Sequence, residues 1–316
     1  MENKKVSVLC ASLMAGEGVV NGFTEKMKEV FTGGYYTLNP GHPNFNKELI
    51  RMTLEHKPDI VFLQIQAPHI ITEETAKEIA KHSFVMNWSG DIRQESPPKW
   101  YLDIGQHIQL STFSNMADVR SCLAKGVAAD WLECGFNPEI YKKHDNPRVT
   151  PEIVAHFNDY GTHAFPLSQY RIDIVNALRA EFGNRFGVFG NFPGALTNFN
   201  SDQLEESRNY AGAKIAINCS HFCVEKYSSD RLSRIMGTGG AVCLSHYFPG
   251  IRDMYEVGNH LHIFENIPDL LTLCRNLLAN PIERERCAAA GQRHALGNYT
   301  FLKMAENIKN LYLKHK

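Results

Sequence analysis

The sequence predicts an α/β protein with two Rossmann-like, doubly wound domains that face each other across a cleft. The chain has 316 residues, more than one typical domain of about 150 residues holds, so two domains are expected. Short apolar runs without polar alternation lie between helix-like segments, which is the pattern of strands buried on both faces of a parallel sheet. This pattern occurs twice, on the two sides of a polar, proline-containing segment at residues 141–152.

Both halves of the chain alternate predicted strands with predicted helices. In the first half, strands are expected at residues 6–12, 35–39, 59–66, 84–90, 108–115 and 129–135, with helices at 19–31, 45–56, 73–81 and 117–126. In the second half, strands are expected at 153–159, 185–191, 213–220, 241–246 and 260–266, with helices at 168–182, 202–210, 229–236 and 267–278. Residues 282–316 have helical periodicity with a break at Gly297 and Asn298. We expect a first domain over residues 1–147 and a second over 148–299.

The composition excludes several classes of protein. Lys and Arg number 33 and Asp and Glu 34, so the formal charge of -1 gives no bulk field for nucleic acid or a membrane surface. The eight cysteines are scattered without a CxxC pair, which indicates a reducing compartment. No uncharged apolar run reaches the ~18 residues of a membrane span, and we expect a cytoplasmic protein. Cys219, His221 and Cys223 alternate at a strand end without a second ligand pair, so no metal site is expected.

The most informative stretch is SSDRLSRIMGTGGAVCLSHYFPGI, which begins at Ser228. It predicts a helix that starts near Asp230 and ends in glycines, followed by a short apolar strand. Arg231 and Arg234 lie three residues apart on one face of this helix. A helix N-terminus beside two guanidinium groups is suited to bind an anion.

The segment from SDRLSRIMGTGGAVCL through PGI and the PIERER helix to NYTF resembles the group-1 glycosyltransferases of the spore-maturation CgeB-like type. The likeness is good over residues 205–305 and looser over 150–204. It implies the GT-B architecture, in which the second domain holds a nucleotide sugar and the terminal helix, residues 300–316, packs back on the first domain. Many relatives have a ribose-binding Glu where this chain has Arg234. A guanidinium cannot accept a hydrogen bond, so Asp230 is the expected substitute.

The residues predicted to bind the donor belong to the second half. The sequence has no Asp-x-Asp motif, which favours a metal-independent site where cations and helix N-termini stabilise the diphosphate. No cofactor is expected, and the donor is expected to be UDP- or GDP-linked. The predicted donor-binding residues are Arg231, Asp230, Arg234, Gly239, Gly240, His246, Arg171, Asn158, Asp159, Tyr160 and Asn191.

The predicted acceptor side belongs to the first half. Asp91 follows the fourth strand beside a glycine, where partial burial could raise its basicity, and it is the first candidate for the catalytic base. His69, after the third strand, and Glu17 are the rival candidates. Gly16 and Gly18 flank Glu17 in a tight loop that could admit the acceptor.

The leading prediction is a metal-independent glycosyltransferase that moves a sugar from a nucleoside-diphosphate sugar to a hydroxyl of a protein, a cell-surface polymer or a small glycan. A phage-type DNA glycosyltransferase acting on hydroxymethylated bases is the first alternative. For DNA, a basic track would be expected near the site. A nucleotide-sugar 2-epimerase and a non-catalytic nucleotide-sugar-binding protein are the others. The acceptor, the stereochemistry and the oligomeric state stay open.

Overall fold

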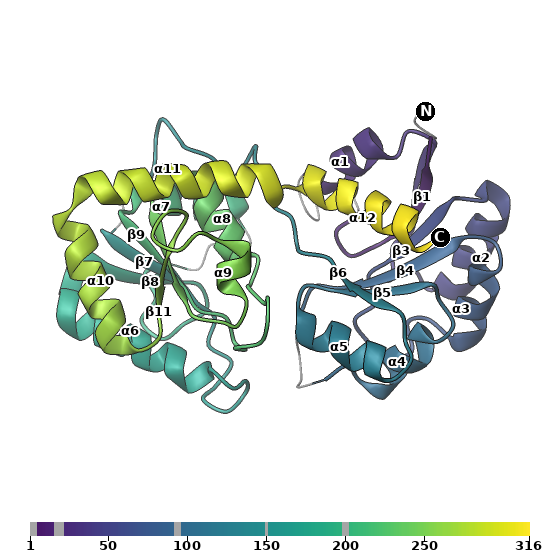
Figure 1. Ribbon diagram of the computed structural model, residues 1–316, viewed down its shortest axis with the longest axis horizontal. Coiled ribbons are helices and arrows are strands. Elements are labelled where there is room, and N and C mark those ends of the chain that lie inside the picture. Colours follow the sequence, from purple (N-terminus) through teal and green to yellow (C-terminus); the bar gives the residue numbers. More distant parts are fainter. Residues whose placement is uncertain (1–4, 16–21, 92–95, 149–150, 198–201) are drawn as a thin grey trace. The chain divides into compact units, whose positions relative to one another are not determined.

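The computed structural model describes residues 5–15, 22–91, 96–148, 151–197 and 202–316. The chain forms two compact units (Figure 1). Unit 1 contains Met1–Asn137 and Phe301–Lys316, and unit 2 contains Pro138–Thr300. Each unit has one parallel sheet with helices on both faces, so the predicted doubly wound α/β fold is confirmed.

Unit 1 is built on a six-stranded sheet with the order β2-β1-β3-β4-β5-β6. Its described pairings are all parallel. The strands are β1 (Ser7–Ala11), β2 (Gly34–Thr37), β3 (Ile60–Leu63), β4 (Phe84–Ser89), β5 (Leu110–Phe113) and β6 (Ala129–Trp131). The helices are α1 (Phe23–Val30), α2 (Phe45–His56), α3 (Glu73–Ala80), α4 (Lys99–Gly105), α5 (Met116–Ala124) and α12 (Phe301–His315).

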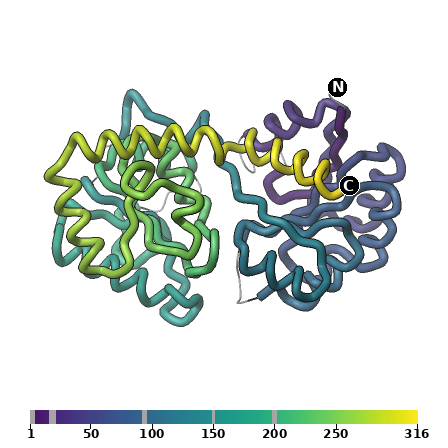
Figure 2. The backbone as a smooth tube through the Cα atoms, viewed as in Figure 1, coloured from purple at the N-terminus to yellow at the C-terminus, as the bar shows by residue number. Residues whose placement is uncertain are grey.

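Two apolar clusters cover the two faces of this sheet. On one face, side chains of α1 and α12 pack on alternate strand residues such as Val8, Phe62 and Met86. On the other face, α2, α3 and α4 pack on the intervening residues, among them Leu9 and Val61. Figure 2 shows α12, in yellow, beside the purple α1, although the two helices lie at opposite ends of the sequence. The first unit therefore needs its last helix to close its core.

Unit 2 is built on a five-stranded parallel sheet with the order β11-β10-β9-β7-β8. Its strands are β7 (Ile153–His156), β8 (Phe186–Phe189), β9 (Ile215–Asn218), β10 (Val242–His246) and β11 (His262–Phe264). Its helices are α6 (Ser168–Phe182), α7 (Gln203–Gly212), α8 (Arg231–Thr238), α9 (Ile251–Met254), α10 (Ile267–Ala279) and α11 (Pro281–Asn298), with a 3-10 turn, η1 (Gly183–Arg185), before β8. Side chains of α6 and α10 join one core cluster with the strands, while α8 packs on β9, β10, α7 and α11.

Strand order determines where such sheets bind ligands. In unit 2 the connection from β7 leads outward to β8, and the chain then returns to the other side of β7 to form β9. In open parallel sheets the crevice at this reversal, outside the carboxyl ends of the two strands, is the usual ligand position. In unit 1 the corresponding reversal lies between β1 and β3.

The elements differ from the predicted ones at a few places. Helices α4 and α9 were not predicted, and the break in the C-terminal helical region falls at Tyr299 and Thr300, after Gly297 and Asn298. Tyr141 and Arg148, in the predicted linker, belong to unit 2 and hydrogen-bond to α7. Within the described ranges, no helix has the length and apolar composition needed to cross a membrane.

Candidate functional site

A buried arginine lies at the strand reversal of unit 2. Arg171 is in the first turn of α6, which directly follows the loop after β7. Its side chain is only 2 % exposed, and its guanidinium lies 4.4 Å from the centroid of the Phe157 ring. One guanidinium nitrogen, Nη1, donates to the His221 ring, 2.8 Å from Nδ1. Phe157 and His221 follow the carboxyl ends of β7 and β9, the two strands that flank the reversal.

The charge of Arg171 has no acidic partner in the part of the chain that the structure describes. Its Nε and Nη2 atoms are buried and make no hydrogen bond to any described residue. Burial, followed by the nearby charge of Arg231, lowers the pKa of Arg171 to about 9. A buried cation with open N–H groups is unfavourable unless an anion binds it. The arrangement is therefore suited to an anionic ligand.

A second arginine lies next to the first. Arg231 opens α8, and its guanidinium is 5.8 Å from the same Phe157 ring that Arg171 contacts. Its Nη1 donates to Ser229 Oγ at 3.1 Å, and Ser229 Oγ donates in turn to Asn218 Oδ1 at 3.1 Å. Asp230, the N-cap residue of α8, makes no side-chain capping hydrogen bond. Arg231 thus adds positive charge beside the N-terminus of α8, the positive end of the helix dipole.

His221 and two aromatic rings border the arginine pair. Burial and the charges of Arg171 and Arg231 lower the pKa of His221 to about 3, so its ring stays neutral and accepts from Arg171. The ring of Phe165 lies 4.7 Å from His221, and that of Tyr160 lies 5.3 Å away. Tyr160 is 56 % exposed. The site therefore combines two cations with an aromatic surface open to solvent.

The loops after β7 and β8 are fastened to each other. The Asn191 N–H donates to Asn158 Oδ1 at 2.9 Å, and the Asp159 N–H donates to the Asn191 carbonyl at 2.7 Å. The side chains of Asn158 and Asn191 are exposed. All of the predicted donor-binding residues in these loops, including Tyr160, thus lie at the carboxyl edge of the sheet, as Arg171 and Arg231 do.

Arg234 takes part in an ionic network one turn along α8. Its Nη2 lies 2.6 Å from Asp230 Oδ2, and its Nη1 lies 3.6 Å from Glu206 Oε2. Glu206 also accepts from the hydroxyls of Tyr141 at 2.6 Å and Tyr210 at 3.1 Å. Two carboxylates therefore balance the charge of Arg234, unlike that of Arg171. The predicted roles of Arg234 and Asp230 in donor binding stay predictions.

Gly239 and Gly240 do not lie with Arg231. They follow the C-terminus of α8, about 12 Å along the helix from its start, at the edge where β10 begins. A Cβ on Gly240 would lie 2.4 Å from the carbonyl oxygen of Ala211 on α7, so this glycine permits close helix packing. The predicted grouping of these glycines with Arg231 is corrected, because a whole helix separates them. His246, the last residue of β10, does lie at the carboxyl edge.

The predicted acceptor residues belong to unit 1. Asp91 follows β4 and is exposed. The loop that carries it is anchored by a hydrogen bond in which Ser114 Oγ donates to the Gly90 carbonyl at 2.8 Å. His69 lies in the loop between β3 and α3 and has a positive φ of 67°. The remaining predicted residues, Gly16, Glu17 and Gly18, lie outside the described residues.

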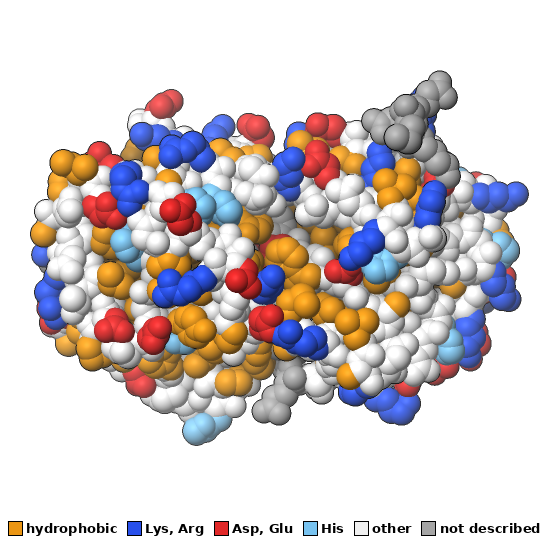
Figure 3. Space-filling view, in the orientation of Figure 1, with side chains coloured by type: hydrophobic (Ala, Val, Ile, Leu, Met, Phe, Trp, Pro, Cys, Tyr) orange, Lys and Arg blue, Asp and Glu red, His pale blue; other side chains and the backbone are white. Residues whose placement is uncertain are grey.

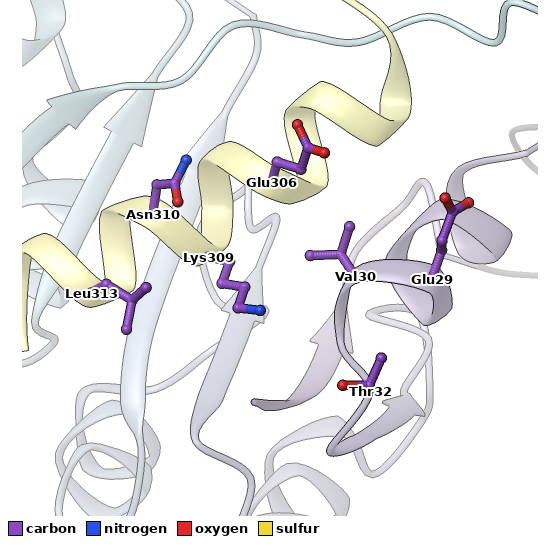
Figure 4. Close-up of a pocket in the computed structure, with 7 residues that line it drawn as sticks. All are labelled: Glu29, Val30, Thr32, Glu306, Lys309, Asn310 and Leu313. Carbon is purple, nitrogen blue, oxygen red and sulfur yellow. The ribbon is translucent and has the colours of Figure 1, made fainter. Parts of the chain in front are cut away.

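Two pockets lined by described residues lie in unit 1. One has a volume of about 280 Å³ and is formed by the β3–α3 loop, the start of α3, and α4. His69 is one of its lining residues, whereas Asp91 is not. The other pocket, of about 460 Å³, lies between α1 and α12, where Lys309 extends from α12 toward the end of α1 (Figure 4). No predicted site residue is among the seven that line this second pocket.

Two further findings bear on the chemistry. Across the described residues, no group of three or more His, Cys, Asp or Glu side chains is placed to hold a metal ion. On the face shown in Figure 3, acidic and basic side chains are interspersed on each unit. The pair of arginines is therefore a local concentration of positive charge on a chain of nearly balanced composition.

Sequence reasoning missed several residues of this site. His221 was considered only as a metal ligand and Phe157 was not considered. Both come directly after strands that end at the reversal, so that position was the signal available for finding them. Glu206 and Tyr141, which fix Arg234, lie 28 and 93 residues before it in the sequence, and no local pattern connects them.

Comparison with known proteins agrees with this geometry. The family model described as "Glycosyl transferase-like" matches residues 171–310, which include most of unit 2 and the first part of α12. The comparison with curated proteins found no match. The structure is similar to a glycosyltransferase from Rickettsia africae ESF-5, with a TM-score of 0.68, 12% identity and coverage of 98% of each chain.

Two further solved structures are similar over nearly the whole chain. Sucrose-phosphate synthase from Thermosynechococcus elongatus has a TM-score of 0.66 and 10% identity, with 97% of this chain and 98% of that chain covered. Anabaena Alr3699/HepE, solved in complex with UDP-glucose, has a TM-score of 0.62 and 10% identity, with 96% and 91% covered. The two units together thus have the GT-B fold. Residues 171–310 thus match a glycosyl transferase-like family model, and the resemblance to the narrower CgeB-like type stays a prediction.

Proposed function

We propose that this enzyme transfers a sugar from a nucleoside-diphosphate sugar to an acceptor hydroxyl without a metal ion, and that unit 2 binds the donor. The observation that carries the proposal is the guanidinium of Arg171, which is buried, cationic and without a carboxylate partner in the described residues. A diphosphate would supply the missing negative charge and accept from the open N–H groups.

The chemistry of the reaction requires this kind of site. Negative charge develops on the diphosphate as the bond to the sugar breaks, and fixed donors lower the energy of that state. Arg171, Arg231 and the N-terminus of α8 are three such sources of positive potential at one edge of the sheet. They perform the task that a divalent metal performs in other glycosyltransferases.

The nucleoside is assigned to the loops after β7 and β8. Asn158 and Asn191 carry exposed amides there, which can pair with the edge of a base. Tyr160 offers an exposed ring against which a base or a sugar can stack. The similar Anabaena protein was solved with UDP-glucose, which supports a uridine nucleotide as the first donor to test.

The acceptor is assigned to unit 1, where two candidate bases are described. Asp91 and His69 follow neighbouring strands, β4 and β3, at their carboxyl ends. Either group could take the proton from the acceptor hydroxyl if it lies within hydrogen-bond reach of it. We propose Asp91 as the base, because its loop is anchored through the Gly90 carbonyl by Ser114.

A thermal-shift series tests the donor site. The purified protein is heated with uridine, UMP, UDP and UDP-glucose, and with the GDP, TDP and CDP counterparts, each with and without EDTA. A ligand at about 100 times its dissociation constant stabilises by about 2.7 kcal/mol. We expect little effect of uridine, a clear shift with UDP, and no effect of EDTA. The absence of a shift with every diphosphate would overturn the proposal, and a shift that EDTA abolishes would overturn the metal-independent mechanism.

A further inference from the structure

The smaller pocket of unit 1 suggests the chemical class of the acceptor. We infer that this pocket binds the pyranose ring of a neutral sugar, so that the acceptor of the proposed reaction is a carbohydrate. Only the identification of the bound sugar as the acceptor rests on the proposed function. Sugar binding by the pocket can be tested by itself, without any donor. Its volume, about 280 Å³, lies near the lower end of the ~300–1,000 Å³ range of small-molecule sites.

The inner part of the pocket is apolar. Ile71 and Ile104 line it and are each 5 % exposed. Trp100 also lines it and is half-buried, with its ring held at 63° against that of Tyr101, whose centroid is 5.5 Å away. An indole ring held in this way offers a fixed aromatic surface at little entropic cost. A pyranose ring has a face of C–H bonds that fits such a surface.

The rim of the pocket accepts hydrogen bonds. Asp103 lines the pocket and is held by Lys99, whose Nζ lies 2.7 and 2.8 Å from the two carboxylate oxygens. Glu73 lines it from the start of α3 and lies 3.2 Å from His107 Nε2. Each carboxylate oxygen can accept more than one hydrogen bond, and an ionised carboxylate donates none. A ligand that fits this rim must therefore carry donors, as sugar hydroxyls do.

The charge of the lining residues and the place of the pocket in the sheet limit the class of ligand that it can bind. Of the described residues that line the pocket, none is a lysine or arginine, which disfavours an anionic ligand such as a nucleic acid or a sugar phosphate. The polar rim disfavours a purely apolar ligand, because its groups would lose water without gaining partners. The pocket is also formed by the loop that follows β3, one of the two strands at the reversal of the unit 1 sheet.

His69 is a second sign that this loop has a function. It lines the pocket and has a positive φ, a conformation that non-glycine residues seldom adopt. Such backbone strain persists where the surrounding structure holds it, and it is frequent at ligand sites. The His69 ring can both donate a hydrogen bond to a sugar hydroxyl and accept one from it. The ionised carboxylates of Glu73 and Asp103 can only accept.

The test measures sugar binding and UDP binding on the same full-length protein. Saturation-transfer NMR with the methyl glycosides of glucose, galactose, mannose and N-acetylglucosamine reports binding to the protein, the pocket variants locate that binding, and calorimetry reports UDP affinity. We expect at least one glycoside to bind the wild type. Trp100→Ala should weaken that binding about fivefold to tenfold, with UDP affinity unchanged. Trp100→Phe, which keeps an aromatic face, should restore most of it.

Further variants keep the test decisive. Asp103→Asn removes a charge at the rim without emptying the pocket, and should weaken the glycoside even if Trp100→Ala fails to fold. Glu48→Gln on α2 is the matched control, because Glu48 also pairs with a neighbouring cation, Arg51, but does not line the pocket. Glycoside binding unchanged in both Trp100→Ala and Asp103→Asn would overturn the inference. So would binding of tetramethylammonium but of no glycoside, which would make the pocket a cation site.

The two proposals fail in different ways. If UDP binds the wild type and no glycoside does, the sugar pocket is refuted while the donor site stands. If a glycoside binds and no nucleoside diphosphate does, the pocket stands and the proposed donor site is refuted.

Discussion

Replacing Arg171 by methionine should make the free protein more stable and the donor complex much weaker. Methionine keeps most of the length of the side chain and can pack on Phe157, but it brings no charge into the interior. The pKa of Arg171 is lowered to about 9 by burial and by Arg231. A shift of this size corresponds to an unfavourable free energy on the order of 5 kcal/mol. Replacement of buried ion pairs by well-packed apolar groups has gained roughly 1–4 kcal/mol in other proteins.

The pH dependence has a definite sign. Because the folded protein holds the proton of Arg171 less tightly than the unfolded chain does, the unfolded state binds more protons between the two pKa values. The cost of the buried charge is therefore fully present below pH 9 and is relieved as the pH rises above it. Urea denaturation of the ligand-free protein should show the variant to be more stable by about 1–4 kcal/mol near neutral pH, and this difference should shrink at about pH 10.

The affinity of Arg171→Met for UDP should fall, although the stability of the free protein rises. The Nε and Nη2 atoms of Arg171 are open, and two charge-assisted contacts of about 1.5 kcal/mol each would weaken UDP about a hundredfold on removal. Calorimetry measures this, with Arg275→Met as control, since Arg275 is an exposed arginine of unit 2 that pairs with Glu181. A variant that is less stable than the wild type, or one that binds UDP equally well, would refute the reasoning.

Three further predictions concern separate parts of the molecule. Arg231→Ala should weaken UDP binding by roughly 1.5–3 kcal/mol, one charge-assisted contact, and unchanged affinity in calorimetry would remove Arg231 from the site. Asp91→Asn should lower kcat while leaving UDP affinity nearly intact, as for a group used only in the transition state, and equal losses of turnover and UDP affinity would make Asp91 structural. Gly240→Ala should destabilise unit 2 by about 1–3 kcal/mol, because its Cβ would lie 2.4 Å from the Ala211 carbonyl oxygen. If denaturation gave Gly240→Ala the same free energy of unfolding as the wild type, α7 and α8 would be able to move apart without cost.

The fold was predictable because its signals are local. The inner strands of both sheets are short apolar runs buried on both faces, such as IVFL in β3 and IAIN in β9, and each can be found without knowledge of its neighbours. Helix α4 was missed because its seven residues follow two prolines and are too few to show a helical period. The break between α11 and α12 was misplaced by two residues, because Gly297 does not end the helix and remains within α11.

The site was predictable only where chain position determines it. Arg171, Asn158 and Arg231 follow strand ends, so their common edge follows from the order of the elements. Gly239 and Gly240 are close to Arg231 in sequence but lie at the other end of α8, and helix length decides this. Arg234 has one local partner, Asp230, but its other partners come from α7 and from Tyr141, which only the tertiary structure brings together.

The position of α12 determines the order in which the two units can complete their folding during synthesis of the chain. Unit 2 is one continuous segment, Pro138–Thr300, and can complete its core as soon as that segment has emerged from the ribosome. Unit 1 begins earlier but lacks Phe301, Met304, Ile308 and Tyr312 of its core until the final helix has been made. The part translated first is therefore the part completed last. Until then α1 alone covers that face of the sheet, and the apolar residues left uncovered make this stage the one most exposed to aggregation.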